Sequence, residues 1–381
     1  MKVTCVVGAR PNFVKIAPIL RAFRAAGGIE ATLLHTGQHY DVSMNTAFFE
    51  ELAIPSPDIN LEIGSGTGTQ QTARMMMALE DALLARRPDV LLVVGDVNST
   101  LATALVGAKL LIPLVHVEAG LRSNDLAMPE EINRLVTDRL SSLLLATERA
   151  GVDNLLREGV PAQNIRLVGN VMIDTLHACL PRAVPLAATL DATGADEAFA
   201  ARLGSGFGFV TLHRPSNVDD PSQLGALLRA LAGIAKDLPL LFAVHPRTRA
   251  AITTAGFEPL IADSGIHVTP PLTYLRAIGV MREARVVLTD SGGVQEETTA
   301  LGVPCLTVRD NTERPITVSE GTNTIVGSDP ARLVPAVATV MQTGGKRGRV
   351  PELWDGRAAE WITQIMREFF GPKSRAGARA A

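Results

Sequence analysis

Short apolar runs alternate with helical patterns along most of this chain, and this alternation constrains the fold more than any other feature. In the first part of the chain the apolar runs cover residues 2–8, 31–34, 90–94, 113–117 and 143–146. Residues 13–26, which follow the first run, place Ile16, Ile19, Leu20 and Phe23 on one face of a helix. Strands that alternate with helices pair in parallel, because the helix returns the chain to the same end of the sheet. The pattern therefore predicts βαβ units and a parallel sheet.

A second series of the same kind begins after a looser stretch. Residues 169–201 are rich in Pro, Ala, Thr and Asp, and Pro181 and Pro185 lie close together. The apolar runs that follow cover residues 208–212, 240–244, 266–268, 286–288, 306–308 and 324–326. The chain has 381 residues, which is longer than a single core usually grows. We therefore predict an α/β fold with two doubly wound, Rossmann-like domains. The first covers residues 1–170 and the second residues 171–354, and we expect a disordered tail at 371–381.

Polar residues follow many of these runs at the point where the predicted strand ends. They are Arg10, His35, Asp96, Glu118, His213, His245 and Asp290. Each one alone is also consistent with a helix cap. Open α/β sheets bind ligands at the carboxyl ends of their strands, so the whole set favours two sheet edges that face one interdomain cleft.

The stretch VVLTDSGGVQEE, residues 286–297, reads as a strand, a glycine turn and the start of a helix. Such a turn presents unpaired backbone N–H groups to an anion, most often a phosphate. An ordinary βα turn is the alternative. Near the N-terminus, Arg10 and Lys15 lie where the helix dipole disfavours cations unless an anion is bound. Two solvated basic residues would explain that placement equally well.

Composition excludes several classes of protein. The formal net charge of −3 argues against nucleic-acid binding, and the composition is that of a soluble globular enzyme. The three cysteines show no disulfide or zinc spacing, so we expect them to be buried small apolar residues. We find no signal peptide and no membrane span, and we predict a cytoplasmic protein. No metal set, P-loop or Ser-His-Asp elbow is recognisable either.

Together these residues have the parts for proton transfer on a phosphorylated or nucleotide-linked substrate. Carboxylates come from the first domain, and a His-Arg pair and an anion-binding turn come from the second. Glu131, Arg134 and Asp138 are spaced to share one helix face. A salt-bridge ladder on the surface is an equally good explanation of that spacing.

Several motifs, taken in order, carry a family resemblance over nearly the whole chain. They are GARPNFVKIAP (8–18), TGQH (36–39), GDVNST (95–100), HVEAGLRS (116–123), MPEEINRLVTD (128–138), LTDSGGVQEE (288–297) and GVPCLTVRDNTERP (302–315). The chain resembles the non-hydrolysing UDP-N-acetylglucosamine 2-epimerases. The resemblance implies a glycosyltransferase B type fold, UDP as the bound nucleotide, and a C-terminal helix near 355–370 that packs back on the first domain. It also implies a homodimer.

The same resemblance implies a reaction and a set of roles. These enzymes invert C2 of the sugar by eliminating UDP to a glycal and adding it back, and no nicotinamide or metal cofactor is required. By motif, Asp96, Glu118 and Glu131 form the acid/base set, with His213 essential in the second domain. The positions that resemble UDP-binding residues are Arg10, Lys15, Ser291, Gly292, Gly293, Glu296 and Arg314. Part of an activating second site is also present, as Gln38, Arg74, Arg214 and His245.

This chain departs from the family pattern at two of these places. Residues 214–217 read RPSN instead of a longer charged run, and residues 38–41 read QHYD instead of QHRQ, so activation by a second substrate molecule stays open. The sugar itself is also open. An epimerase of a modified UDP-sugar, such as a diacetamido-uronic acid, is one alternative. A UDP-sugar glycosyltransferase and a nucleotide-binding module without catalysis are the others.

Overall fold

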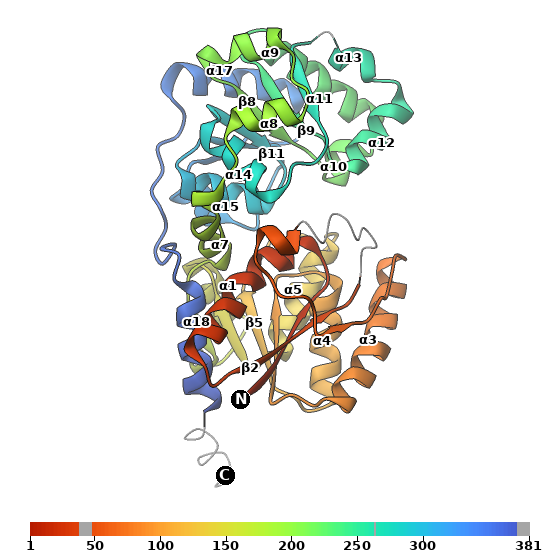
Figure 1. Cartoon of the computed structure of the whole chain (residues 1–381), viewed down its shortest axis with the longest axis vertical. Helices are drawn as coiled ribbons and strands as arrows, with labels where there is room; N and C mark the ends of the chain where they lie inside the picture. Colours follow the sequence, from red (N-terminus) through yellow and green to blue (C-terminus); the bar gives the residue numbers. More distant parts are fainter. Residues whose placement is uncertain (38–47, 263, 372–381) are drawn as a thin grey trace. The chain divides into compact units, whose positions relative to one another are not determined.

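The computed structural model describes residues 1–37, 48–262 and 264–371. Contacts within the chain divide it into two compact units, drawn in Figure 1. The first unit comprises Met1–Ala178 and the chain from Glu352 onward, and the second comprises Cys179–Pro351. Each unit contains its own parallel sheet, which confirms the predicted α/β fold with two doubly wound domains.

The first unit has a seven-stranded sheet in the order β3-β2-β1-β4-β5-β6-β7. Its strands are β1 (Lys2–Val7), β2 (Glu30–His35), β3 (Ile59–Asn60), β4 (Val90–Val94), β5 (Leu114–Ala119), β6 (Leu143–Ala146) and β7 (Ile165–Leu167). Its helices are α1 (Arg10–Ala26), α3 (Gly68–Ala85), α4 (Asn98–Lys109), α5 (Pro129–Leu140), α6 (Arg149–Arg157), α7 (Val171–Cys179) and α18 (Ala358–Phe370). Every strand pair is parallel, and every residue of β4 is buried, as a sheet covered on both faces requires.

The second unit repeats this plan with six strands in the order β10-β9-β8-β11-β12-β13. Its strands are β8 (Gly208–Thr211), β9 (Leu240–Ala243), β10 (Ile266–Thr269), β11 (Val286–Thr289), β12 (Cys305–Thr307) and β13 (Asn323–Ile325). Its longer helices are α8 (Leu186–Ala192), α11 (Pro221–Ile234), α12 (Pro246–Ala255), α14 (Tyr274–Glu283), α15 (Gly292–Leu301) and α17 (Leu333–Thr343). Leu227 and Leu231 of α11 pack with Phe242 and Leu288 of the strands in the core of this unit.

Strand order reverses at the first strand of each sheet. In the first unit the chain passes from β1 outward to β3 and then returns to the other side of β1 with β4. In the second unit β8 and β11 meet in the same way. The carboxyl ends of such adjacent strands are where doubly wound sheets bind ligands. Residues that follow β1, β4, β8 and β11 therefore occupy the favoured position for a binding site.

The boundary between the units differs from the predicted one at residues 170/171. Helix α7 belongs mainly to the first unit, because Thr175 donates a 2.6 Å hydrogen bond to the carbonyl of Val14 in α1. The chain returns to the first unit at Glu352, and α18 packs against α1. Asp174 accepts hydrogen bonds from the first two backbone N–H groups of α18, at 3.1 and 2.7 Å. The predicted tail beyond residue 371 lies outside the described residues.

Burial explains the cysteines as expected. Cys5, Cys179 and Cys305 are all buried, and none of the three forms a disulfide. Burial raises the pKa of Cys5 and of Cys305 to about 12, so both are thiols. Across the described ranges, no helix has the length and apolar character to cross a bilayer.

Candidate active site

The turn after β4, which carries Asp96, is held by side chains from three different elements. The three consecutive carbonyl groups of residues 94–96 accept hydrogen bonds from Asn12 Nδ2, His116 Nε2 and Asn133 Nδ2, at 2.7, 2.8 and 2.8 Å. These donors come from α1, β5 and α5. The backbone that presents Asp96 is therefore fixed along its whole length.

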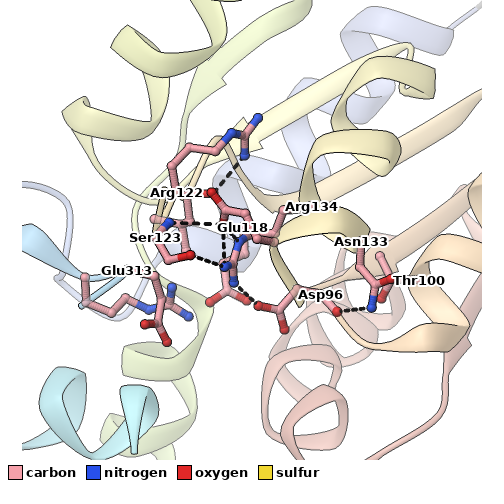
Figure 2. Close-up of polar contacts among 12 residues, drawn as sticks. Asp96, Thr100, Glu118, Arg122, Ser123, Asn133, Arg134 and Glu313 are labelled. Atoms are coloured by element: carbon pink, nitrogen blue, oxygen red, sulfur yellow. Dashed lines mark hydrogen bonds and ion pairs between the residues drawn. The ribbon is translucent and has the colours of Figure 1, made fainter. Parts of the chain in front are cut away.

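Asp96 is the most accessible carboxylate of the predicted acid/base set. Its side chain is 24% exposed, whereas those of Glu118 and Glu131 are almost fully buried. Arg134 forms an ion pair with Asp96, and Figure 2 shows the guanidinium of Arg134 directed toward that carboxylate. Asp96 can therefore reach solvent or a ligand while a buried cation stabilises its charge.

Glu131 uses both carboxylate oxygens inside the protein. The backbone N–H groups of Ser123 and Asn124 each donate to it at 3.0 Å, and Arg134 donates from Nε and Nη2 at 2.9 and 2.6 Å. Burial opposes its charged form, but the hydrogen bonds from Ser123 and Arg134 outweigh burial and lower the pKa of Glu131. Glu131 therefore holds Arg134 in place, and its role in proton transfer stays a prediction.

The surface-ladder explanation of the α5 spacing is wrong. Glu131, Arg134 and Asp138 are all buried. Their partners are Asp96 and other groups on neighbouring elements, so the shared face of α5 points into the unit. A buried charged network must be satisfied by hydrogen bonds, and this one is.

Glu118 adopts a backbone conformation that side-chain-bearing residues rarely use. Its φ is 76°, and the pairing of β5 with β6 shifts register between Val117 and Ala119 at this point. Backbone strain of this kind is concentrated at functional sites, because a structure retains it only where the rest of the fold enforces it. Lys15 Nζ forms a buried ion pair with Glu118 Oε2. The predicted phosphate ligand Lys15 thus contacts a carboxylate of the acid/base set.

Two further predicted residues of the first unit, Arg10 and Arg74, lie on α1 and α3. Arg10 begins α1, and its guanidinium carbon lies 4.6 Å from the centre of the Phe48 ring. Arg74 on α3 donates to the carbonyl of Ser65 at 2.8 Å, which anchors the preceding loop. Gln38, the other predicted second-site residue, lies outside the described residues.

In the second unit, His213 follows β8 and is oriented by a buried carboxylate. Its Nδ1 lies 2.8 Å from Oδ1 of Asp290, which follows β11 and is fully buried. Asp290 also accepts the backbone N–H of His213 and of Arg214 and the Asn217 amide, at 2.9 to 3.1 Å. Burial opposes the charged form of Asp290, but the His213 contact outweighs it and lowers the pKa of Asp290. Because Nδ1 is engaged, Nε2 is the nitrogen that His213 offers to a substrate.

The glycine turn that the sequence predicts to bind an anion lies at the start of α15. Ser291 precedes the helix, and its backbone N–H donates to Thr289 Oγ1 at 3.0 Å. The Ser291 side chain makes no capping hydrogen bond. A Cβ atom on Gly292 would lie 2.7 Å from Oε1 of Glu313, so a side chain at this position would displace the Glu313 carboxylate. The N-terminus of α15 therefore presents backbone donors without a bulky side chain.

Arginines surround this turn, each paired with a buried carboxylate. Arg314 Nε lies 2.7 Å from Oε1 of Glu296, and Arg309 Nη2 lies 2.9 Å from Oε2 of Glu313. Arg214 lies farther from Glu313, at 3.7 Å. Burial opposes the charged form of Glu313, but the arginines outweigh it and lower its pKa to about 2. Arg214, Arg309 and Arg314 thus bring three guanidinium groups close to this turn, and guanidinium groups suit the recognition of a diphosphate.

Two residues of the predicted second site also lie in this unit. His245 caps α12, and its Nδ1 accepts the backbone N–H of Arg247 at 3.2 Å. The ring centres of His213 and His245 are 5.5 Å apart. The structure thus brings His245 and Arg214 to the same strand ends as His213.

Sequence reasoning identified the strand-end carboxylates but missed the residues that hold them. Asn12, His116 and Asn133 do not directly follow a strand. In the sequence they look like ordinary core or helix positions. Asp290 was recognised as a strand-end residue, yet its contact with His213 depends on the pairing of β8 with β11. Among the residues that the structure describes, no three His, Cys, Asp or Glu side chains are grouped to hold a metal.

Comparison with known proteins identifies relatives of this chain. The family model described as UDP-N-acetylglucosamine 2-epimerase matches residues 21–367. The UDP-N-acetylglucosamine 2-epimerase of Methanocaldococcus jannaschii is 40% identical over 372 residues, which cover 96% of this chain and 99% of that protein. The UDP-2,3-diacetamido-2,3-dideoxy-D-glucuronate 2-epimerase of Pseudomonas aeruginosa is 40% identical over 342 residues, which cover 89% of this chain and 92% of that protein.

A solved structure shows the same similarity in three dimensions. The crystal structure of the Methanocaldococcus jannaschii UDP-GlcNAc 2-epimerase, in complex with UDP-GlcNAc and UDP, matches with a TM-score of 0.84 and 39% identity. The match covers 97% of this chain and 100% of that one. Family model, sequence and fold therefore agree over nearly the whole length, and this chain belongs to the UDP-N-acetylglucosamine 2-epimerase family.

Proposed function

We propose that this enzyme interconverts UDP-N-acetylglucosamine and UDP-N-acetylmannosamine. The observation that carries the proposal is that Asp96, Glu118 and Glu131, at the carboxyl ends of β4 and β5 and the start of α5, are each paired with a cation. Inversion at C2 needs groups that take a proton from one face of the sugar and give one to the other. The likeness to an epimerase crystallised with UDP-GlcNAc and UDP supports this choice of substrate.

In the proposed reaction a base removes the C2 proton, and the C1–O bond breaks with its electron pair leaving on UDP. The neutral sugar product of this elimination is a glycal. UDP then adds back to C1, and C2 accepts a proton on the opposite face. No electrons are gained or lost overall, so neither a nicotinamide nor another redox group is consumed. The energetic demand lies in the weak acidity of C2–H and in the charge of departing UDP.

The two units supply different parts of this chemistry. Asp96, with its exposed oxygen, and Glu118, with its paired Lys15, are the acid/base groups of the first unit. Ser291, Gly292, Gly293, Glu296 and Arg314 of the second unit hold UDP, and His213 acts from the same edge. Lys15 and Arg10 are the cations of the first unit that support the departing diphosphate. Lys15 does this while also stabilising the charged form of Glu118.

Solvent isotope exchange tests the proposal. We expect the purified protein to incorporate deuterium at C2 of UDP-N-acetylglucosamine in D2O and to form the manno epimer, without added metal or NAD. Proton NMR of the sugar reports both events at once. A sample without protein controls for spontaneous exchange. If neither deuterium nor epimer forms, the proposal is wrong for this substrate.

A modified UDP-sugar is the second candidate substrate, because the Pseudomonas aeruginosa relative bears the name of a diacetamido-glucuronate 2-epimerase and is 40% identical. Parallel kcat/KM measurements with both sugars would decide between them. A glycosyltransferase of this fold would instead transfer the sugar to an acceptor without exchanging the C2 proton.

Assembly and regulation are further predictions from the family. We expect a homodimer, which light scattering would detect as twice the chain mass of 40.4 kDa. The second-site residues Arg74, Arg214 and His245 allow activation by a second substrate molecule, and sigmoidal dependence of rate on substrate would reveal it. A cytoplasmic location stays a prediction.

A further inference from the structure

We infer that His116 and Asp138 form a buried ion pair that braces the two turns carrying Asp96 and Glu118, which makes His116 a positioning residue of this enzyme. The inference rests on the proposed function for its kinetic consequence, although the ion pair itself can be tested without any substrate. His116 does not reach the sugar in this role. It acts through the backbone that presents the carboxylates.

Both ring nitrogens of His116 face hydrogen-bond acceptors. Nδ1 lies 2.6 Å from Oδ1 of Asp138, and Nε2 lies 2.8 Å from the carbonyl oxygen of Gly95. The side chain of His116 has no solvent exposure, and that of Asp138 has 1%. Water therefore cannot replace the partner of either ring nitrogen.

These contacts determine where the protons lie. A carbonyl oxygen cannot donate, so Nε2 of His116 carries a hydrogen. Asp138 also accepts the backbone N–H of Gly120 at 3.0 Å and the guanidinium of Arg122 at 2.8 Å. Burial opposes the charged form of Asp138, yet its pKa is lowered. The donors from Gly120 and Arg122 favour the carboxylate whatever the charge of His116. Asp138 is thus a carboxylate, Nδ1 must donate to it, and the ring is an imidazolium.

The surrounding charges agree with this assignment. Arg122 also forms two hydrogen bonds with Glu158, at 2.8 and 2.7 Å. Two cations, His116 and Arg122, then balance two carboxylates, Asp138 and Glu158. Arg122 divides its charge between buried Asp138 and the partly exposed Glu158, so a charged His116 completes the neutralisation of Asp138.

The pair joins the two turns that matter for the proposed reaction. Gly95 directly precedes Asp96, and its carbonyl is fixed by the ring of His116. Gly120 lies two residues after Glu118, and its N–H is fixed by Asp138. One ion pair therefore sets the positions of both carboxylates. Asn12 and Asn133 donate hydrogen bonds to the neighbouring carbonyls, but their side chains are uncharged and are not part of the ion pair.

NMR of the imidazole rings tests the ion pair directly. In protein labelled with 15N at histidine, we expect His116 to show two protonated ring nitrogens and two slowly exchanging N–H signals at pH 7.5, without substrate. His116→Gln identifies the signal by its loss. A spectrum in which one nitrogen of His116 lacks a proton would overturn the inference. The signal is measured in the unaltered protein. If His116→Gln fails to fold, substituting the other six histidines one at a time leaves the His116 signal as the one that none of them removes.

Kinetics tests the positioning role. We expect His116→Gln to lower kcat about 100-fold while KM changes less than about threefold, because misplacement of catalytic groups costs turnover more than binding. His177→Gln, which alters an exposed histidine of the same unit, is the matched control and should keep full activity. UDP affinity of the folded variant should be unchanged. Normal kcat in His116→Gln, or an equal loss in His177→Gln, would refute the role. Absence of epimerisation in the unaltered enzyme would refute the proposed function and leave the NMR result standing.

Discussion

The two strand-end regions of this protein use charge in opposite ways. In the first unit, the carboxylates Asp96, Glu118 and Glu131 are each paired with a cation, and two of the three are buried. In the second unit, three arginines lie close to the turn of backbone donors that begins α15. Both regions occupy the same position in the same kind of sheet.

The difference shows how one fold serves two tasks. Proton transfer needs carboxylates whose positions and protonation are controlled, and the first unit provides this with buried cations and a braced backbone. Under the proposed function, the second unit would hold the diphosphate with guanidinium groups and the backbone N–H groups of a helix N-terminus. Variants in one region should therefore affect turnover, and variants in the other should affect nucleotide affinity.

The largest effect should follow from Asp96→Asn in the first unit. The amide keeps the shape of the side chain but cannot accept a proton, so we expect kcat to fall about 1000-fold with UDP affinity within about threefold of normal. Steady-state kinetics and calorimetric titration with UDP would measure the two quantities. Asp153→Asn, an exposed site on α6, should behave as the unaltered enzyme. A parallel loss of UDP binding would mean that Asp96 contacts the nucleotide, and the contrast between the regions would then fail.

A stability effect should come next, from Glu297→Gln beneath the anion-binding turn. Burial raises the pKa of Glu297 from 4.5 to about 7. Between these pH values the folded state keeps a proton that the unfolded state has released, so stability falls as pH rises. The total loss is on the order of 3 kcal/mol. Glu297→Gln removes this dependence, and the variant should be the more stable protein at pH 8.

Urea unfolding at pH 5 and pH 8, followed by fluorescence, would measure this effect. Glu197→Gln, an exposed site in the same unit, should leave the pH dependence unchanged. If the free energy of unfolding depends on pH in the same way in Glu297→Gln and in the unaltered protein, Glu297 is ionised in the folded state.

The smallest effect should follow from Arg314→Lys in the second unit. Lysine keeps the charge beside Glu296 but loses the planar fork of donors that recognises a diphosphate. We expect UDP to bind about tenfold more weakly, with kcat at saturating substrate within about twofold of normal. Arg282→Lys on the exposed face of α14 is the control. A large fall in kcat with unchanged UDP affinity would assign Arg314 to the chemistry.

Most of the fold could be predicted from the sequence because its strands are buried on both faces. Runs such as those of β4 and β11 are almost entirely apolar, and the sequence predicts each of them to within a residue of its observed ends. Two strands were missed. β3 and β7 have two and three residues, which is too short for a period to be recognised.

The site was predictable only in part, for a physical reason. Strand-end carboxylates such as Asp96 can be recognised in the sequence because they come just after an apolar run. Partners such as His116 lie inside the run, where a polar residue of β5 looks like an interruption of the strand. Its significance depends on Gly95 and Asp138, which are 21 and 22 residues away in the chain. Spacing within a single element cannot contain that information.

The second unit is inserted between α7 and α18 of the first, and this connectivity fixes the order in which the protein can be completed during synthesis. The whole of Cys179–Pro351 is synthesised before any residue of α18 exists. Until then, the α1 surface that α18 covers stays open and Asp174 lacks the N–H groups of its helix. The unit that begins the chain is therefore the last to be finished.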